Sequence, residues 1–275
     1  MPRVLLVLLL TLIMAVIAAA GVTAAPQAEL WEEWTDHDPT STRTVDHSRW
    51  NRFLEAYLIT DDPSGINLLP YGEVSEEDRN SLDRYLEDLQ GIAVSQLNRA
   101  EQRAFWLNLY NAATVEVILD HYPVDSIREI DISGAFSNGP WGAELVSVEG
   151  VPLTLDDIEH RILRPIYRDP RIHYAVNCAS IGCPNLQPEA FTAENYERLA
   201  DRGARQFVNH PRGVDPDARP IVLSSIYTWF SEDFGDSRED LVAHLREYAD
   251  PALAAELEDY EGRFSYDYDW SLNEP

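Results

Sequence analysis

The chain has 275 residues, of which 45% are hydrophobic and 10% aromatic, and its formal net charge is -27. This composition is sufficient for one well-buried core, and it excludes a disordered acidic chain because such chains lack aromatic residues. The negative charge disfavours nucleic acid and anionic lipid surfaces as partners, since proteins bind both through basic patches. The expected partner is a small molecule of unknown identity or an envelope protein.

The N-terminus has the pattern of an export signal. Arg3 supplies the positive charge, residues 4–21 form an almost continuous apolar run, and Val22–Ala24 is a small-residue cleavage site. We therefore expect residues 1–24 to be a signal peptide, and the mature protein to be exported to the periplasm or secreted, without membrane contact after cleavage. The alternative is a retained anchor, because the apolar run is nearly long enough to span a bilayer.

Hydrophobic periodicity predicts one mostly helical α+β domain over residues 45–273, after a loose lead-in over residues 25–44. Apolar residues at helical spacing, bounded by capping and turn residues, predict helices in eight places: from Val45 to the turn at Asp61–Gly65, Ser75–Leu89, Arg99–His121, from Thr154 onwards, Ala193–Asn209, Ser224–Phe230, Leu241–Tyr248 and Ala252–Tyr260. The helix Arg99–His121 is apolar almost all round and is therefore expected in the core.

Alternation of apolar and polar residues predicts several short strands. They are expected at Leu145–Leu153, which turns as a hairpin at Glu149–Gly150, and at Arg171–Asn177, Ile221–Leu223 and Phe264–Trp270. Together they are expected to form one small mixed or antiparallel sheet. Since no repeat and no long linker divides the chain, a single domain is expected.

Cys178 lies at the end of a predicted strand and is followed by small residues, a favourable place for a nucleophilic thiol. His173 is the nearest histidine in the sequence and the candidate base. Strand alternation places His173 and Cys178 on opposite faces, so a direct catalytic pair requires a bulge or a bend.

A structural disulfide between Cys178 and Cys183 is the alternative use of the two thiols. They are the only cysteines of the chain, and such a pair is commonly oxidised in an exported protein.

Two cysteines without a second half-site fall short of the four ligands of zinc, so no metal is expected. The chain contains no nucleotide-binding glycine motif and no other cofactor motif, so no cofactor is expected either.

Several polar side chains are candidates for lining a cleft. Asn108 and Asn111 share one face of the apolar helix Arg99–His121. A buried amide there must find hydrogen-bond partners. The two side chains therefore either tie loops to the core or line the cleft. Asn177 and Ser180 lie within two residues of Cys178 in the sequence and are further candidates for lining the cleft.

Glu159 lies beside the apolar stripe of its helix. If half-buried, its pKa would be raised, as suits a general acid or base. The alternative is an ion pair with Arg171, Arg164 or Arg161, and Arg171 is also a cleft candidate. The adjacent His160 is expected on the solvent side.

The sequence resembles the domain of unknown function 547 family, over nearly the whole span from Val45 to Asn273. The matching stretches are Ala104–Asn111, Ser126–Arg128, Leu155–His160, Asp169–Pro184, Leu223–Ser224 with Trp229 and Asp233–Phe234, and Tyr268–Asn273. The resemblance implies one domain and an exported bacterial member, and it implies no activity. It also implies a role for Cys178 beyond a disulfide, because plant intracellular relatives keep this thiol and lack the one at Cys183.

Two classes of function fit these residues. The first is a non-catalytic binding or interaction module of the cell envelope, which is favoured because strand alternation separates His173 from Cys178. The alternative is a thiol-dependent hydrolase or transferase with Cys178 as nucleophile and His173 as base. In that enzyme Asn108 or Asn111 would orient the base or bind the oxyanion.

Overall fold

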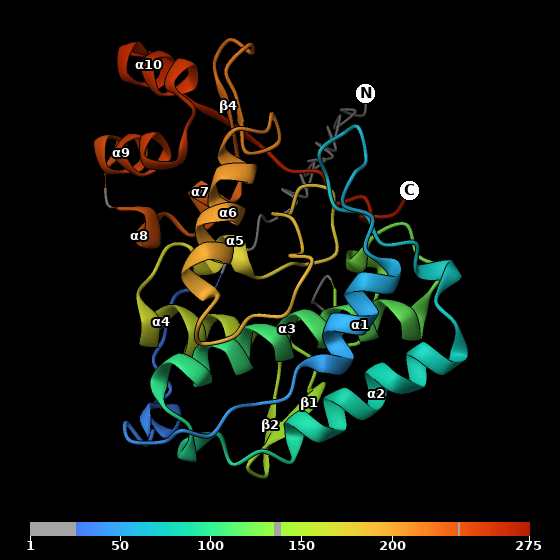
Figure 1. Ribbon diagram of the computed structural model, residues 1–275. Helices are drawn as coiled ribbons and strands as arrows, with labels where there is room; N and C mark the ends of the chain where they lie inside the picture. The colour runs from blue at the N-terminus through green and yellow to red at the C-terminus, as the bar shows by residue number, and fades with distance from the viewer. Residues whose placement is uncertain (1–25, 135–138, 236) are drawn as a thin grey trace, which may run out of the picture.

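The computed structural model describes residues 26–134, 139–235 and 237–275 (Figure 1). Its α-helices are α1 (Ser48–Tyr57), α2 (Glu76–Gln90), α3 (Arg99–His121), α4 (Arg164–Tyr167), α5 (Ile172–Ala175), α6 (Tyr196–Val208), α7 (Ile226–Trp229), α8 (Ser231–Phe234), α9 (Arg238–Tyr248) and α10 (Pro251–Asp259). Short 3₁₀ turns are η1 (Glu32–Thr35), η2 (Tyr71–Glu73), η3 (Val94–Gln96) and η4 (Ile127–Glu129), and η5 (Asp157–Leu163) is a π-helix.

One sequence prediction cannot be compared with this range. The expected signal peptide, residues 1–24, lies outside the described residues. Within the described part of the chain, none of the helices combines the length and the apolar character that a membrane crossing requires.

Helix α3 is the central element of the fold, as its sequence predicts. Its N-cap is Asn98, whose side chain accepts a hydrogen bond from the Glu101 backbone N–H. Nearly all its residues from Ala104 to Leu119 are buried, because α2, η5 and the chain segments around them enclose it (Figure 1). A helix enclosed on every side has no polar face, which is why its hydrophobic pattern lacks the usual amphipathic period.

Helix α2 covers α3 through one apolar stripe. Ser75 caps it by accepting a hydrogen bond from the Asp78 N–H, and acidic residues occupy its first turn, where the helix dipole favours them. The stripe of Leu82, Tyr85, Leu86 and Leu89 is buried against the core. The predicted helix Ser75–Leu89 is therefore confirmed within one residue at each end.

The strands form two separate small sheets and not the one sheet that we expected. Strands β1 (Val146–Val148) and β2 (Val151–Leu153) make the predicted antiparallel hairpin. In the second sheet, β4 (Val222–Ser224) pairs antiparallel with β3 (Val214–Asp215) and parallel with β5 (Ser265–Asp267). The expected fold class, a mostly helical α+β domain, is confirmed.

The predicted strand Arg171–Asn177 is wrong, because this segment contains helix α5. Residues Ile172 to Ala175 are all buried, so burial does not alternate along the segment. The apparent alternation of residue types therefore does not distinguish a strand from a buried helix here. Asp169 favours the helical turn because its carboxylate accepts the backbone N–H of Arg171. The buried segment therefore turns through a helix and then leaves it toward Cys178.

Two apolar cores lie on either side of this segment. The larger one surrounds α3, and the smaller one lies among α6, α7, α8 and α9 and contains Tyr174, Phe207 and Leu245. Tyr174 belongs to the smaller core, whereas its neighbours Ile172 and Ala175 belong to the larger one. The segment that carries both cysteines therefore follows directly on the boundary between the two cores.

The N-terminal lead-in is not loose from residue 26 onwards. The backbone N–H groups of Glu29 and Trp31 donate to the carbonyls of His160 and Arg161 at 3.0 Å each. Trp34 is buried and packs edge-to-face on Trp106 of α3, with ring centroids 5.1 Å apart. The lead-in is thus packed against the domain and covers η5.

Candidate functional site

The thiol loop, defined here as residues 177–184, is held to α3 by a buried amide. Asn111 donates from Nδ2 to the Ala175 carbonyl at 2.9 Å and accepts the Asn177 backbone N–H at 2.8 Å. Asn177 in turn donates to the Pro184 carbonyl and accepts the Ala179 N–H, which closes the loop on itself. The turn requires a left-handed backbone at Ala179, whose φ is 56°. Asn111 and Asn177 therefore shape the loop, and neither has a free amide to line a cleft.

The C-terminal segment crosses the same loop. Ile181 N–H donates to the Ser271 carbonyl and Gly182 N–H to the Asp269 carbonyl, both at 2.8 Å. A Cβ atom on Gly182 would lie 2.8 Å from the Asp269 oxygen, so only glycine permits this approach. These contacts bring Tyr268 beside the cysteines.

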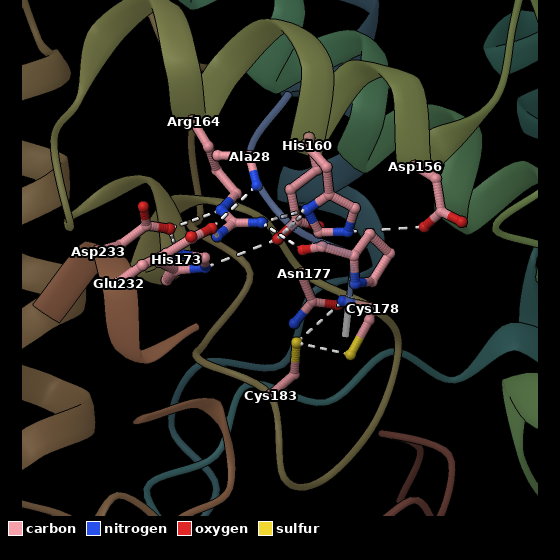
Figure 2. Close-up of polar contacts among 12 residues, drawn as sticks. Ala28, Asp156, His160, Arg164, His173, Asn177, Cys178, Cys183, Glu232 and Asp233 are labelled. Carbon is pink, nitrogen blue, oxygen red and sulfur yellow. Dashed lines mark hydrogen bonds and ion pairs between the residues drawn. The ribbon is translucent and has the colours of Figure 1, made fainter. Parts of the chain in front are cut away.

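The two cysteine sulfurs lie 2.9 Å apart and are not bonded to each other (Figure 2). The backbone N–H of Cys178 also donates to the Cys183 sulfur at 2.9 Å. Cys178 is partly exposed, whereas Cys183 is buried. The disulfide that we considered from the sequence is therefore absent from the structure, although the two thiols are placed together.

The Cys178 sulfur has two hydroxyl neighbours besides Cys183. Tyr268 Oη lies 3.0 Å away and Ser180 Oγ 3.2 Å away, and these two oxygens lie 3.0 Å from each other. Hydrogen bonding from Cys183 and from these hydroxyls outweighs burial and lowers the pKa of Cys178 below its ordinary value. Burial, together with the adjacent Cys178, raises the pKa of Cys183 well above its ordinary value. The pair thus consists of one thiol that ionises readily and one that keeps its proton.

Arg212 also binds the thiol loop through hydrogen bonds. Its guanidinium donates to the Ile181 carbonyl at 2.9 Å and to Asn185 Oδ1 at 2.6 Å. Burial lowers the pKa of Arg212 to about 10, and Cys183 and Tyr268 lie near enough to act on it electrostatically. Sequence reasoning missed Arg212 and Tyr268, because both are distant from the cysteines in the chain.

His173 does not face Cys178. Its Nε2 lies 2.7 Å from Asp233 Oδ2 and its Nδ1 lies 3.6 Å from Glu159 Oε1, while its ring stacks on Phe230. Burial opposes a charge on His173, but Asp233 and Glu159 outweigh it and raise the pKa of the imidazole. Over the described residues, no imidazole nitrogen lies within hydrogen-bonding distance of the Cys178 sulfur. The catalytic pair predicted from the sequence is not formed.

Glu159 belongs to an ionic cluster that makes no hydrogen bond or ion pair with the two cysteines among the described residues. Figure 2 shows His160, Arg164, His173, Glu232 and Asp233 of this cluster together with Cys178 and Cys183. The cluster consists of Glu159, His160, Arg164, His173, Glu232 and Asp233. Burial raises the pKa of Glu159, but the adjacent His160, His173 and Arg164 lower it by more, to about 2. The expected raised pKa is therefore wrong, since we had considered burial without these cationic neighbours.

His160 is buried, with 5% of its surface exposed, and is not on the solvent side as expected. The π-helix η5 has a wider turn than an α-helix, so counting by 3.6 residues assigns its faces wrongly. The lead-in adds to this burial, because it is hydrogen-bonded over the same turn. Burial also lowers the pKa of His160 to about 4.

Arg164 is the arginine that pairs with this cluster. Its side chain is 1% exposed, and it contacts Asp233 Oδ2 at 2.5 Å and Glu232 Oε1 at 2.7 Å. It also donates to the Pro26 carbonyl at 2.8 Å, which ties the lead-in to the cluster. The other two candidates pair elsewhere: Arg161 with Asp157, and Arg171 with Asp169, Glu197 and Asp201.

Asn108 ties a second loop to α3. Its amide donates to the Phe191 carbonyl at 2.8 Å and accepts the Phe191 N–H at 2.9 Å. Among the side chains singled out from the sequence, Cys178 contacts Cys183 and Ser180, and Asn177 shapes their loop. His173 instead contacts Glu159. In the parts of the chain that the structure describes, His, Cys, Asp and Glu side chains form no group of three or more that is suited to a metal ion.

The fold and the site define a mostly helical α+β protein with a pair of thiols in a loop that follows the boundary between two apolar cores. Residues 94–208, which contain α3 and the thiol loop, match the model of a family described as "Protein of unknown function, DUF547". The similarity to this family is thus shown over residues 94–208 of the chain. Comparisons with curated proteins and with solved structures found no match.

Proposed function

We propose that the protein catalyses thiol–disulfide exchange, with Cys178 as the attacking thiolate and Cys183 as the second thiol. The observation that carries this proposal is the asymmetric pair: two free sulfurs 2.9 Å apart, one partly exposed and one buried. The lowered pKa of Cys178 and the raised pKa of Cys183 agree with these roles. The thiolate is the nucleophile in exchange, so the exposed thiol should be the one that ionises.

The reaction uses a disulfide as its co-reactant. The Cys178 thiolate attacks one sulfur of the substrate disulfide, forming a mixed disulfide and releasing the other substrate sulfur as a thiolate, which takes a proton from solvent. Cys183 then gives up its proton to solvent and attacks the Cys178 sulfur. This forms the Cys178–Cys183 disulfide and releases the second substrate sulfur as a thiolate, which takes a proton from solvent. The substrate gains two electrons and the protein loses two.

This chemistry suits the site better than the hydrolase or transferase that we considered from the sequence. Acyl transfer by Cys178 requires a base to remove protons during turnover, and the ring nitrogens of His173 face Asp233 and Glu159. Exchange requires a thiol that ionises readily and a second thiol next to it. The hydroxyl of Tyr268 and the sulfur of Cys183, 3.0 and 2.9 Å from the Cys178 sulfur, support both requirements. We propose that it takes place outside the cytoplasm, in the periplasm or after secretion, on the basis of the signal pattern in residues 1–24.

A non-catalytic binding module of the envelope is the second candidate. It is favoured because the ring nitrogens of His173 face Asp233 and Glu159 and not Cys178. Partly exposed aromatic side chains near the thiols also favour it, namely Trp229, Tyr268 and Trp270. In such a module the sulfurs would only shape the loop. Replacing Cys178 would then leave ligand binding unchanged.

The test uses the mature chain, reduced and freed of reductant, mixed with a small disulfide such as oxidised glutathione. Mass spectrometry of the acid-quenched protein should show a product lighter by two hydrogen atoms, the internal disulfide. The Cys183→Ser variant should stop at the mixed disulfide, and Cys178→Ser should react far more slowly. Equal rates for wild type and Cys178→Ser, or no reaction of either, would overturn the proposal and favour the binding module.

A further inference from the structure

A group of aromatic side chains borders the thiol pair. We call Trp229, Tyr268 and Trp270 the aromatic platform. Each of the three is partly exposed, and their ring centroids lie 4.6 to 5.6 Å apart. The Tyr268 hydroxyl lies 3.0 Å from the Cys178 sulfur, so the platform adjoins the atom that would attack a substrate.

The platform is not simply the edge of one core. Trp270 packs against the larger core around α3, whereas Trp229 and Tyr268 pack against the smaller core. The three rings therefore meet where the two cores adjoin, and they stay partly exposed there. Contiguous aromatic surface of this kind is typical of ligand-binding sites, where large rigid rings supply most of the binding energy.

The charges around the platform favour a cationic ligand. Asp267 and Asp269 flank Tyr268 in the sequence, and both are exposed. The guanidinium of Arg128 already lies 5.2 Å from the Trp270 ring centroid, which shows that a platform ring accepts a cation. Arg212, which lies near Tyr268, uses its guanidinium to bind the thiol loop. The whole chain, with a net charge of -27, would also attract a cation over longer distance.

We propose that the aromatic platform binds a lysine or arginine side chain of a peptide, next to the cysteine whose disulfide Cys178 attacks. This inference rests on the proposed function and names its substrate class. A cation over an aromatic face gains roughly 0.5 to 2 kcal/mol, depending on how far it is desolvated. Because an extended chain advances about 3.3 Å per residue, the basic residue should lie within about two positions of the substrate cysteine.

The experiment compares two probe peptides in which the cysteine forms a disulfide with the same small thiol. One carries arginine next to the cysteine, and the other carries citrulline, which has nearly the same shape and no charge. We expect reduced wild-type protein to react about tenfold faster with the arginine peptide, a factor that corresponds to 1.4 kcal/mol. Tryptophan fluorescence of Cys178→Ser, which binds without reacting, should show a similar preference. Both preferences should decrease at high salt.

The Trp229→Leu variant should lose the preference for arginine, so that its rates with the arginine and citrulline peptides become nearly equal. Its matched control is Trp31→Leu, which removes a partly exposed tryptophan that packs on Arg161, away from the platform. The control should keep the preference. Thermal unfolding of both variants would show that they are folded.

The possible failures of this inference and of the proposed function are distinguishable. Equal rates and equal binding for the two peptides would overturn the inference and leave thiol–disulfide exchange intact. No reaction with either peptide, together with preferential binding of the arginine peptide, would support the platform as a site for cations and overturn the exchange reaction. Retention of the arginine preference in Trp229→Leu would exclude this platform as its source.

Discussion

The hydroxyl of Tyr268 lies 3.0 Å from the sulfur of Cys178, although ninety residues separate them in the chain. A hydroxyl at this distance stabilises a thiolate more than a thiol, because it donates a hydrogen bond to the charged form. Tyr268 therefore contributes to the lowered pKa of Cys178, together with Cys183 and Ser180. A residue of the C-terminal segment is thus part of the environment that lowers the pKa of a thiol in the middle of the chain.

Replacing Tyr268 by Phe should make Cys178 less reactive. Losing one hydrogen bond to a thiolate costs about 1.5 kcal/mol, so alkylation by iodoacetamide at pH 7 should slow by about tenfold. The reaction should also need a higher pH to reach half its maximal rate. Tyr266→Phe is the matched control, because Tyr266 is 42% exposed on the same segment and should leave both values unchanged. An unaltered profile for Tyr268→Phe would show that this hydroxyl does not stabilise the thiolate.

Replacing Gly182 by Ala should disturb the thiol loop. The added Cβ would lie 2.8 and 2.9 Å from the backbone oxygen and nitrogen of Asp269, and backbone atoms cannot move away as a side-chain end can. We expect a loss of about 1–3 kcal/mol in the free energy of unfolding, measured with urea. Gly91→Ala is the control, because its Cβ would approach no atom closer than 3.4 Å. A destabilisation equal in the two variants would contradict the close approach at Gly182.

Replacing Arg164 by Met should destabilise the protein strongly. The substitution leaves Asp233 and the buried Glu159 without their arginine, and breaking a buried ion pair from one side costs about 3–5 kcal/mol. Arg246→Met removes an exposed ion pair with Glu258 and should change the free energy of unfolding by less than about 1 kcal/mol. Similar values for the two variants in urea unfolding would show that the ionic cluster contributes little.

The stability of the protein should fall as the pH falls from about 6.5 to 4, in part because of His47. Burial lowers the pKa of His47 to about 4, and its Nδ1 lies 2.6 Å from the Tyr85 hydroxyl. Between the unfolded pKa of about 6.5 and the folded value, the unfolded chain binds a proton that the folded chain does not. The stability contribution is therefore complete above pH 6.5 and is lost as the pH falls, by about 3 kcal/mol in total.

The comparison for this pH dependence is His47→Gln, which has no group that titrates in this range. Urea unfolding at several pH values should give a flatter profile for the variant than for the wild type. His173 acts with the opposite sign, since its raised pKa gives a contribution that is present at low pH and lost as the pH rises. Identical profiles for wild type and His47→Gln would show that His47 is not buried in its neutral form.

Local sequence patterns predicted most of the helices and the hairpin. Helix α2 has a capping serine, an acidic first turn and one apolar stripe, and each of these acts within a few residues of the chain. Helix α3 could be placed in the core because no face of it is polar. The segment Ile172–Ala175 could not be assigned, because a stretch buried on every side carries no period.

The sequence by itself determined that Cys178 and Cys183 lie together, since five positions in a tight loop cannot separate them far. It also determined that Asn111 would need a buried partner, since an amide on an apolar helix must be satisfied. Only the tertiary structure decided that Tyr268 and Arg212 surround the thiols, that His173 faces Asp233, and that His160 is buried under the lead-in. The physical reason is that these contacts join segments distant in the chain, and their pairing depends on how two cores and a π-helix pack, which no local pattern encodes.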